Sequence, residues 1–216
     1  MGRSLHHASA ARPAALVAAA LACGLVAPAA RAQVSLGLGL GAVASSNLVT
    51  DSIVEAIRVR PRIAPQLTIR VEKPLSGRYR LAGEISVSHS ALMAYGDTST
   101  RVTGLTLWAP VIAIEAAATS WLGAEARLGA VIYKPGQRDG TLFSDGVPVM
   151  PTLGLGLRAE RRVTSGIRGS LQVRYDLHRF TTTRLKARGF TGETVVHRIA
   201  LGVAFHRSFG RAPASR

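Results

Sequence analysis

Apolar and polar residues alternate without a break along the eleven residues of the stretch 167–177, IRGSLQVRYDL. Leu171, Val173 and Tyr175 share one parity, and Arg168 and Arg174 share the other. Because side chains of a strand point alternately to its two faces, this stretch predicts one β-strand with an apolar face and a charged face. At ~3.3 Å per residue the strand would be about 35 Å long, enough to cross a bilayer even when tilted.

The same alternation recurs along the rest of the chain and predicts eight strands. The expected strands cover residues 34–44, 62–72, 79–88, 102–116, 122–132, 149–161, 167–177 and 198–205, and the last parity continues to 209. Long connections (45–58, 89–101, 134–147, 179–193) alternate with short ones (73–77, 117–120, 162–166). This rhythm predicts an all-β fold, an eight-stranded antiparallel up-and-down transmembrane β-barrel with short periplasmic turns and longer extracellular loops.

One expected strand, 102–116, changes parity in its middle. Leu105 and Leu107 keep one parity, whereas Trp108, Pro110 and Ile112 keep the other. A one-residue phase change beside a proline is what a β-bulge produces, because proline cannot donate to the ladder. The sequence therefore predicts a bulge between Leu107 and Pro110.

The polar face of the expected strands carries seven arginines and six acids, although the whole chain has a net charge of +15. These residues are Arg70, Glu72, Arg80, Glu84, Glu115, Glu125, Arg127, Arg158, Glu160, Arg168, Arg174, Asp176 and Arg198. Balanced charges interleaved with glycines suit a narrow lumen, where buried charges must be paired. We therefore expect an ion-pair network inside the barrel, the apolar face toward lipid, and no open pore, since eight strands leave a lumen that side chains fill. The alternative is a soluble periplasmic, lipocalin-like ligand binder with its apolar face inward.

Residues 1–32 have the pattern of a cleavable signal peptide. Arg3 and Arg12 precede the apolar run 13–30, and Ala30-Arg31-Ala32 offers a small-x-small cleavage site. The domains expected are therefore this leader, a barrel over 33–209 and a short C-terminal tail over 210–216. The single cysteine, Cys23, lies in the leader, so an exported chain would have no disulfide and no cysteine-based metal site.

The basic balance of an exported chain favours anionic lipid and lipopolysaccharide as partners over nucleic acid. The last long connection carries Arg179, Arg184, Lys186 and Arg188, and we expect it to be an anionic-lipid loop that holds phosphates. An ordinary solvated loop is the alternative. The four histidines of the barrel region show no metal-ligand spacing, so we expect no metal and no cofactor, and we expect a monomer.

With its eight alternating segments, its loop rhythm and its leader, the chain resembles the small eight-stranded outer-membrane barrels of the OmpA transmembrane domain, OmpX and OmpW type. The resemblance covers 33–209 and rests on the strand pattern. It implies residence in the outer membrane of a Gram-negative cell. It also implies insertion by the barrel-insertion machinery, which reads an aromatic-terminated last strand; Phe205 and Phe209 form a partial version of that signal.

Ser88-His89-Ser90, where the third expected strand enters a long connection, is the one cluster with the composition of a catalytic site. Some barrels of this size are lipid A deacylases with a serine and a histidine at the membrane surface. Such catalysis needs the base within hydrogen-bond reach of the hydroxyl. The leading hypothesis is a non-enzymatic outer-membrane barrel with a structural or surface-interaction role; the alternative is a lipid A acyl hydrolase that uses His89 and Ser90.

Overall fold

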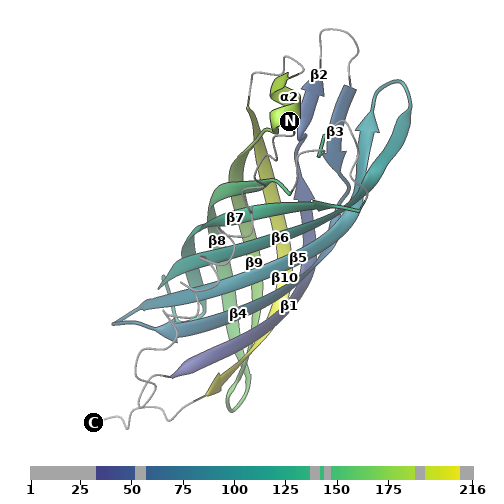
Figure 1. Cartoon of the computed structure of the whole chain (residues 1–216). Coiled ribbons are helices and arrows are strands. Elements are labelled where there is room, and N and C mark those ends of the chain that lie inside the picture. Colours follow the sequence, from purple (N-terminus) through teal and green to yellow (C-terminus); the bar gives the residue numbers. More distant parts are fainter. Residues whose placement is uncertain (1–32, 52–56, 137–141, 144–146, 188–192, 210–216) are drawn as a thin grey trace, which may run out of the picture. The chain divides into compact units, whose positions relative to one another are not determined.

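Eight antiparallel strands close into a ring in the computed structural model of the chain (Figure 1). They are β1 (Val34–Ser45), β4 (Ala64–Pro74), β5 (Tyr79–Tyr95), β6 (Ser99–Ala117), β7 (Leu122–Pro135), β8 (Val149–Thr164), β9 (Ile167–Phe180) and β10 (Thr194–Phe209). Each strand pairs with the next along the chain, and β10 pairs with β1 to close the ring. The structure describes residues 33–51, 57–136, 142–143, 147–187 and 193–209. The eight-stranded up-and-down barrel is therefore confirmed, whereas the expected leader and tail lie outside the described residues.

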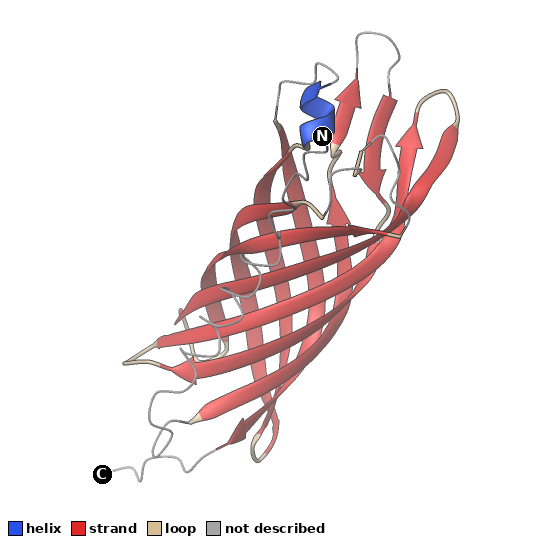
Figure 2. Ribbon diagram, viewed as in Figure 1, coloured by secondary structure: helices blue, strands red, loops and turns tan. Residues whose placement is uncertain are grey.

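Short and long connections lie at opposite ends of the barrel (Figure 2). The end with the tight connections β4–β5, β6–β7 and β8–β9 is called the short-turn rim. The other end is called the long-loop rim, and it carries β2 (Val49–Asp51), β3 (Ile57–Pro61) and the helix α2 (Thr183–Ala187). No helix among the described residues is both long enough and apolar enough to span a membrane.

Two of the four segments expected as long loops contain strand instead. Pairing of β5 with β6 continues to Tyr95 and Ser99, so the expected connection 89–101 is largely a hairpin. In the first connection, β2 pairs with β3, and β3 pairs with the far end of β5. The alternation fails to predict these strands because neither face of a hairpin beyond the barrel has to be uniformly apolar.

The apolar face of each ring strand points outward. Leu36, Leu40 and Leu155 are 41%, 66% and 66% exposed, whereas Arg70 and Glu84 on the opposite face are each 1% exposed. A soluble barrel that encloses an apolar ligand requires the reverse arrangement. The lipid-facing orientation predicted from the charge balance is the one that the structure has.

The bulge predicted between Leu107 and Pro110 is wrong. Leu107 pairs with Tyr133 and Trp108 with Ile132, and the same register resumes at Val111. Leu105 and Leu107 point inward together with Glu115, so the strand keeps one phase from Thr103 to Glu115. The parity argument failed because it assumed that every inward residue is polar.

The lumen in fact changes character along its axis. Toward the long-loop rim, buried apolar side chains form one cluster, which we call the apolar plug: Leu48, Val49, Val59, Leu92, Leu105, Leu107, Ala109, Val131, Tyr133, Leu142, Phe143, Phe180, Leu185 and Val196. Toward the short-turn rim, the inward residues are mostly charged. The β5–β6 irregularity lies between Leu92 and Met93, beside the plug.

Candidate functional site in the lumen

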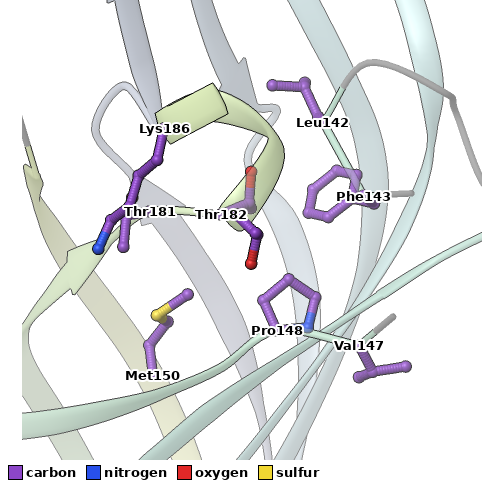
Figure 3. A pocket seen from close by; sticks show the side chains of 9 residues that line it. Leu142, Phe143, Val147, Pro148, Met150, Thr181, Thr182 and Lys186 are labelled. Carbon is purple, nitrogen blue, oxygen red and sulfur yellow. The ribbon is translucent and has the colours of Figure 1, made fainter. Parts of the chain in front are cut away.

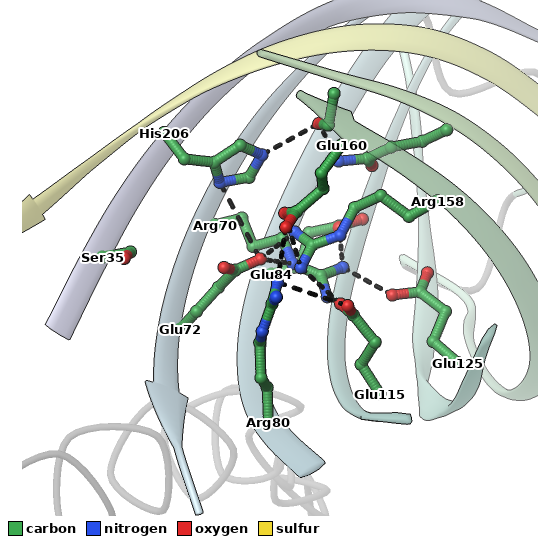
Figure 4. A network of polar contacts seen from close by, with 12 residues as sticks. Ser35, Arg70, Glu72, Arg80, Glu84, Glu115, Glu125, Arg158, Glu160 and His206 are labelled. Atoms are coloured by element: carbon green, nitrogen blue, oxygen red, sulfur yellow. Dashed lines mark hydrogen bonds and ion pairs between the residues drawn. The ribbon is translucent and has the colours of Figure 1, made fainter. Parts of the chain in front are cut away.

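Arg70 on β4 lies among four carboxylates inside the barrel (Figure 4). Its Nε is 2.7 Å from Glu72, its Nη1 is 2.7 Å from Glu125 and 3.2 Å from Glu84, and its Nη2 is 3.3 Å from Glu115. The acids come from β4, β5, β6 and β7, so one guanidinium ties four strands together. Every one of these side chains is at most 3% exposed.

Glu84 on β5 has the reverse arrangement, because it is one acid surrounded by three arginines. It accepts from Arg127 at 2.9 Å and from Arg70, and it forms a close ion pair with Arg174. Arg127 in turn donates to Glu125 at 2.6 Å and to Asp176 at 3.2 Å. Glu84 and Arg127 therefore each have three partners of opposite charge, which compensates the burial of ions away from water.

The network continues to the short-turn rim through Arg158 and Glu160 on β8. Arg158 forms close ion pairs with Glu72 and Glu115. Glu160 accepts from Arg80 at 2.7 Å and from Arg168 at 2.9 Å. Arg80 and Arg168 are 27% and 24% exposed in their side chains, so the rim end of the network reaches solvent.

Two of these ion pairs cross the whole lumen. β4 and β8 are opposite each other in the ring, as are β5 and β9. The pair Arg158–Glu72 joins β8 to β4, and the pair Arg174–Glu84 joins β9 to β5. At the level of these two ion pairs, side chains therefore fill the axis of the barrel and connect opposite strands of the ring.

Glycines make room for the large charged side chains on neighbouring strands. A Cβ built on Gly156 would lie 2.5 Å from Glu125 Oε1, and one built on Gly123 would lie 2.7 Å from Glu115 Oε1. Both distances are shorter than any normal contact, so a larger residue would displace the carboxylate. The glycines that interrupt the polar face are thus part of the network.

The structure brings together twelve of the thirteen charged residues that the sequence singles out for the lumen. Arg198 is the exception: it is 2% exposed, yet its Nε and Nη1 have no hydrogen-bond partner within the described part of the chain. It pairs in register with Asp176 and lies between the network and the apolar plug. Its guanidinium is therefore buried without the direct ion pairs that the other arginines of the set form.

Neutral polar residues complete the network, and the sequence reasoning missed them. Gln66 Oε1 accepts from Arg174 at 2.6 Å, and Ser35 Oγ accepts from Arg168 at 3.1 Å. His206 is fully buried, and its Nε2 is 3.0 Å from Ser170 Oγ. All share the inward parity of the arginines, so parity alone could have found them.

Glu72, Glu160 and His206 are close enough to be considered as metal ligands, because one ligand atom of each lies within 4.8 Å of the others. The two carboxylates are already bound by Arg158, and Arg168 contacts both as well. These guanidiniums supply the positive charge that a cation would bring. The cluster is therefore arranged as part of the ion-pair network.

The catalytic candidates do not form a site. His89 and Ser90 are neighbours on β5, so their side chains point to opposite faces of the sheet. His89 is exposed, and its Nδ1 is 2.9 Å from Thr106 Oγ1 on β6. The base and the hydroxyl proposed for hydrolysis are consequently separated by the wall of the barrel.

The expected anionic-lipid loop is only partly described. Arg179 forms an ion pair with Glu193 at 3.3 Å, and Lys186 lines a cavity instead of joining Arg179. The side chain of Arg184 and the whole of Arg188 lie outside the described residues. The cavity, of about 260 Å³, is bordered by Phe143 and other residues near the plug (Figure 3).

No family model matches the chain, and no curated protein is similar to it in sequence. Solved structures with the same fold are found. Neisserial surface protein A is 14% identical with a TM-score of 0.54, over 82% of this chain and 97% of that one. OprG, an outer-membrane protein of Pseudomonas aeruginosa, is 10% identical with a TM-score of 0.55, over 84% and 97%. The outer-membrane protein AlkL, solved in lipid bilayers, is 12% identical with a TM-score of 0.53, over the full length of both. The chain thus shares the fold of small outer-membrane barrels.

Proposed function

We propose that this protein is a non-enzymatic resident of the bacterial outer membrane, with a closed lumen and a structural or surface-interaction role. The short-turn rim faces the periplasm, and the long-loop rim faces the outside of the cell. One observation carries the proposal: ion pairs join opposite walls inside a ring whose outer face is apolar. A ring of this kind hides its charges and presents hydrocarbon to its surroundings, as a bilayer requires.

The two halves of the lumen support a closed barrel. The network fills the periplasmic half with paired charges, and the apolar plug fills the outer half with packed aliphatic and aromatic side chains. Tyr133 and Phe180 of the plug lie 5.1 Å apart between ring centroids, and Tyr133 Oη on β7 is 2.5 Å from His178 Nε2 on β9, two strands away along the wall. A solute would have to break both layers to cross.

The surface role rests on the long-loop rim, where β2, β3, the β5–β6 hairpin and α2 extend the barrel. Lipopolysaccharide and outer-membrane lipid are the partners that fit this location, and the barrel-insertion machinery would place the protein there. The barrel needs no second copy to close its sheet, which favours a monomer.

Membrane fractionation followed by electrophoresis with and without boiling tests the proposal. We expect the protein in the outer-membrane fraction, and we expect the unboiled detergent-folded form to migrate differently from the boiled form. Release of the protein as a soluble periplasmic species would overturn the proposal. A membrane-bound species whose mobility does not depend on boiling would also contradict a stable closed barrel.

A further inference from the structure

Three arginines form a row on the outer surface of the long-loop rim. Arg58, Arg60 and Arg62 alternate with Val59 and Pro61 in and after β3, and all three are exposed while the two between them are buried. Alternate residues of a strand lie about 7 Å apart on one face. We call Arg58, Arg60 and Arg62 the arginine ladder.

The ladder begins where the apolar outer surface ends. Ile63, next to Arg62, is 74% exposed and has the same parity as Leu67 and Ile69, the outward residues of β4. Arg62 therefore lies at the border of the lipid-facing belt, and β3 carries Arg60 and Arg58 away from it. The exposed side chains thus change from apolar at Ile63 to cationic at Arg62.

Within the described part of the chain, the charges of the ladder are not neutralised by an acid. Arg179 at the same rim is neutralised by Glu193, whereas no acid among the described residues forms an ion pair with any of the three. The guanidinium of Arg60 is held over the ring of Tyr95, 4.7 Å from its centroid. Such stacking restricts the guanidinium and leaves its in-plane N–H groups available to donate hydrogen bonds.

A hollow of about 380 Å³ lies at the foot of the ladder. Arg60, Arg62 and Tyr95 line it together with the apolar side chains of Ala44 and Ile63. A site with two guanidiniums on one side and exposed aliphatic groups on the other fits an amphiphile. Arginine binds phosphate oxygens through parallel N–H bonds, which makes phosphate the natural anion.

We propose that the arginine ladder is a binding site for a phosphorylated glycolipid of the outer leaflet, the lipid A part of lipopolysaccharide. This inference rests on the proposed function, because it places the ladder at the outer surface of the outer membrane. The acyl chains lie against the apolar belt below Ile63, a phosphate occupies the hollow at Arg62 and Arg60, and Arg58 meets anionic groups of the sugar region above. A soluble polyanion would use the arginines but would gain nothing from Ile63 and Ala44.

The test compares matched variants of the folded protein in detergent, titrated with fluorescent lipid A and with the same lipid A after removal of its phosphates. The ladder variant is R58Q/R60Q/R62Q. The control variant R78Q/R161Q/R207Q removes the same three charges from exposed positions at the short-turn rim. A heparin fragment serves as a lipid-free polyanion. Heat-dependent mobility, read from the same samples, reports separately whether the barrel has formed.

Wild type and the control variant should bind lipid A with similar affinity. The ladder variant should bind on the order of 100-fold more weakly, since each arginine near an anionic lipid surface contributes about a fivefold effect. Wild type should lose a comparable factor with dephosphorylated lipid A. Equal losses in the two variants, or binding that does not depend on the phosphates, would overturn the proposal. Tighter binding of the heparin fragment than of lipid A would also overturn it in favour of a soluble polyanion.

Discussion

Arg174 on β9 and Glu84 on β5 form an ion pair between strands that stand opposite each other in the ring. Neither side chain is more than 4% exposed, and Glu84 is also bound by Arg70 and Arg127. One acid thus compensates three buried guanidiniums and links four strands across the lumen.

Removal of the Glu84 carboxylate should be strongly destabilising. The variant E84Q keeps the shape of the side chain but leaves three arginines with one acid fewer, and breaking a buried pair in this way costs about 3–5 kcal/mol. Urea titration of the folded protein in lipid vesicles, followed by electrophoretic mobility, measures the free energy of unfolding. The matched control E193Q breaks the exposed pair with Arg179 and should change that free energy by less than about 1 kcal/mol. Similar effects of the two variants would mean that the network does not stabilise the barrel.

Arg198 should respond in the opposite way from the arginines of the network. Its guanidinium is buried with two nitrogens unpartnered, so replacing it with a methionine of similar length should leave the free energy of unfolding unchanged or raise it by about 1–3 kcal/mol. R174M, which leaves Glu84 with one partner fewer, should lower the free energy of unfolding. The comparison uses the same urea titration, and a large destabilisation by R198M would show that Arg198 has a partner that the geometry lacks.

The glycines beside the acids give a steric test of the network. An alanine at Gly156 would push its Cβ against Glu125, and such overpacking costs about 1–3 kcal/mol. An alanine at Gly104, where the added Cβ would lie 3.5 Å or more from its neighbours, should cost far less. Melting temperatures of the two variants in detergent check the difference. If G104A proves as damaging as G156A, close approach to the carboxylate is not the reason for the glycine.

The orientation of His89 predicts that it has no catalytic role. Because Ser90 lies on the opposite face of β5, the variant H89A should leave the acyl chains of lipid A unchanged in cells that produce the protein. Mass spectrometry of extracted lipid A from cells with wild type, with H89A and without the protein measures this. Loss of an acyl chain that depends on wild-type His89 would establish the hydrolase alternative instead.

The alternation of residues was sufficient to predict the ring, the strand order and the direction of each face, because a bilayer demands an apolar outer surface at every outward position. It could not predict the inside in the same way. Leu105 and Leu107 point inward in the plug, and treating every inward residue as polar turned a regular strand into a predicted bulge. The side chains of the lumen face other side chains and not lipid, so both paired charges and packed apolar groups are stable there. Which of the two occurs at a position depends on its neighbours in space.

The arginine ladder was missed for a related reason. Arg58 fell within a predicted loop and Arg62 at the start of a predicted strand, so no common face was assigned to them. Their shared surface depends on β3 pairing with the far end of β5, a contact of residues more than thirty positions apart. Pairing at that distance is set by the tertiary fold and leaves no local pattern in the sequence.

The central claim is that side chains close the lumen along its whole length, and electrical recording across a planar lipid bilayer tests it most directly. The folded protein is inserted into the membrane under voltage, and a general porin in the same membrane serves as the positive control. The account predicts insertion without discrete conductance steps, because the Arg/Glu network and the apolar plug lie in series along one path. Stable, stepwise ion conductance from wild-type protein would contradict it.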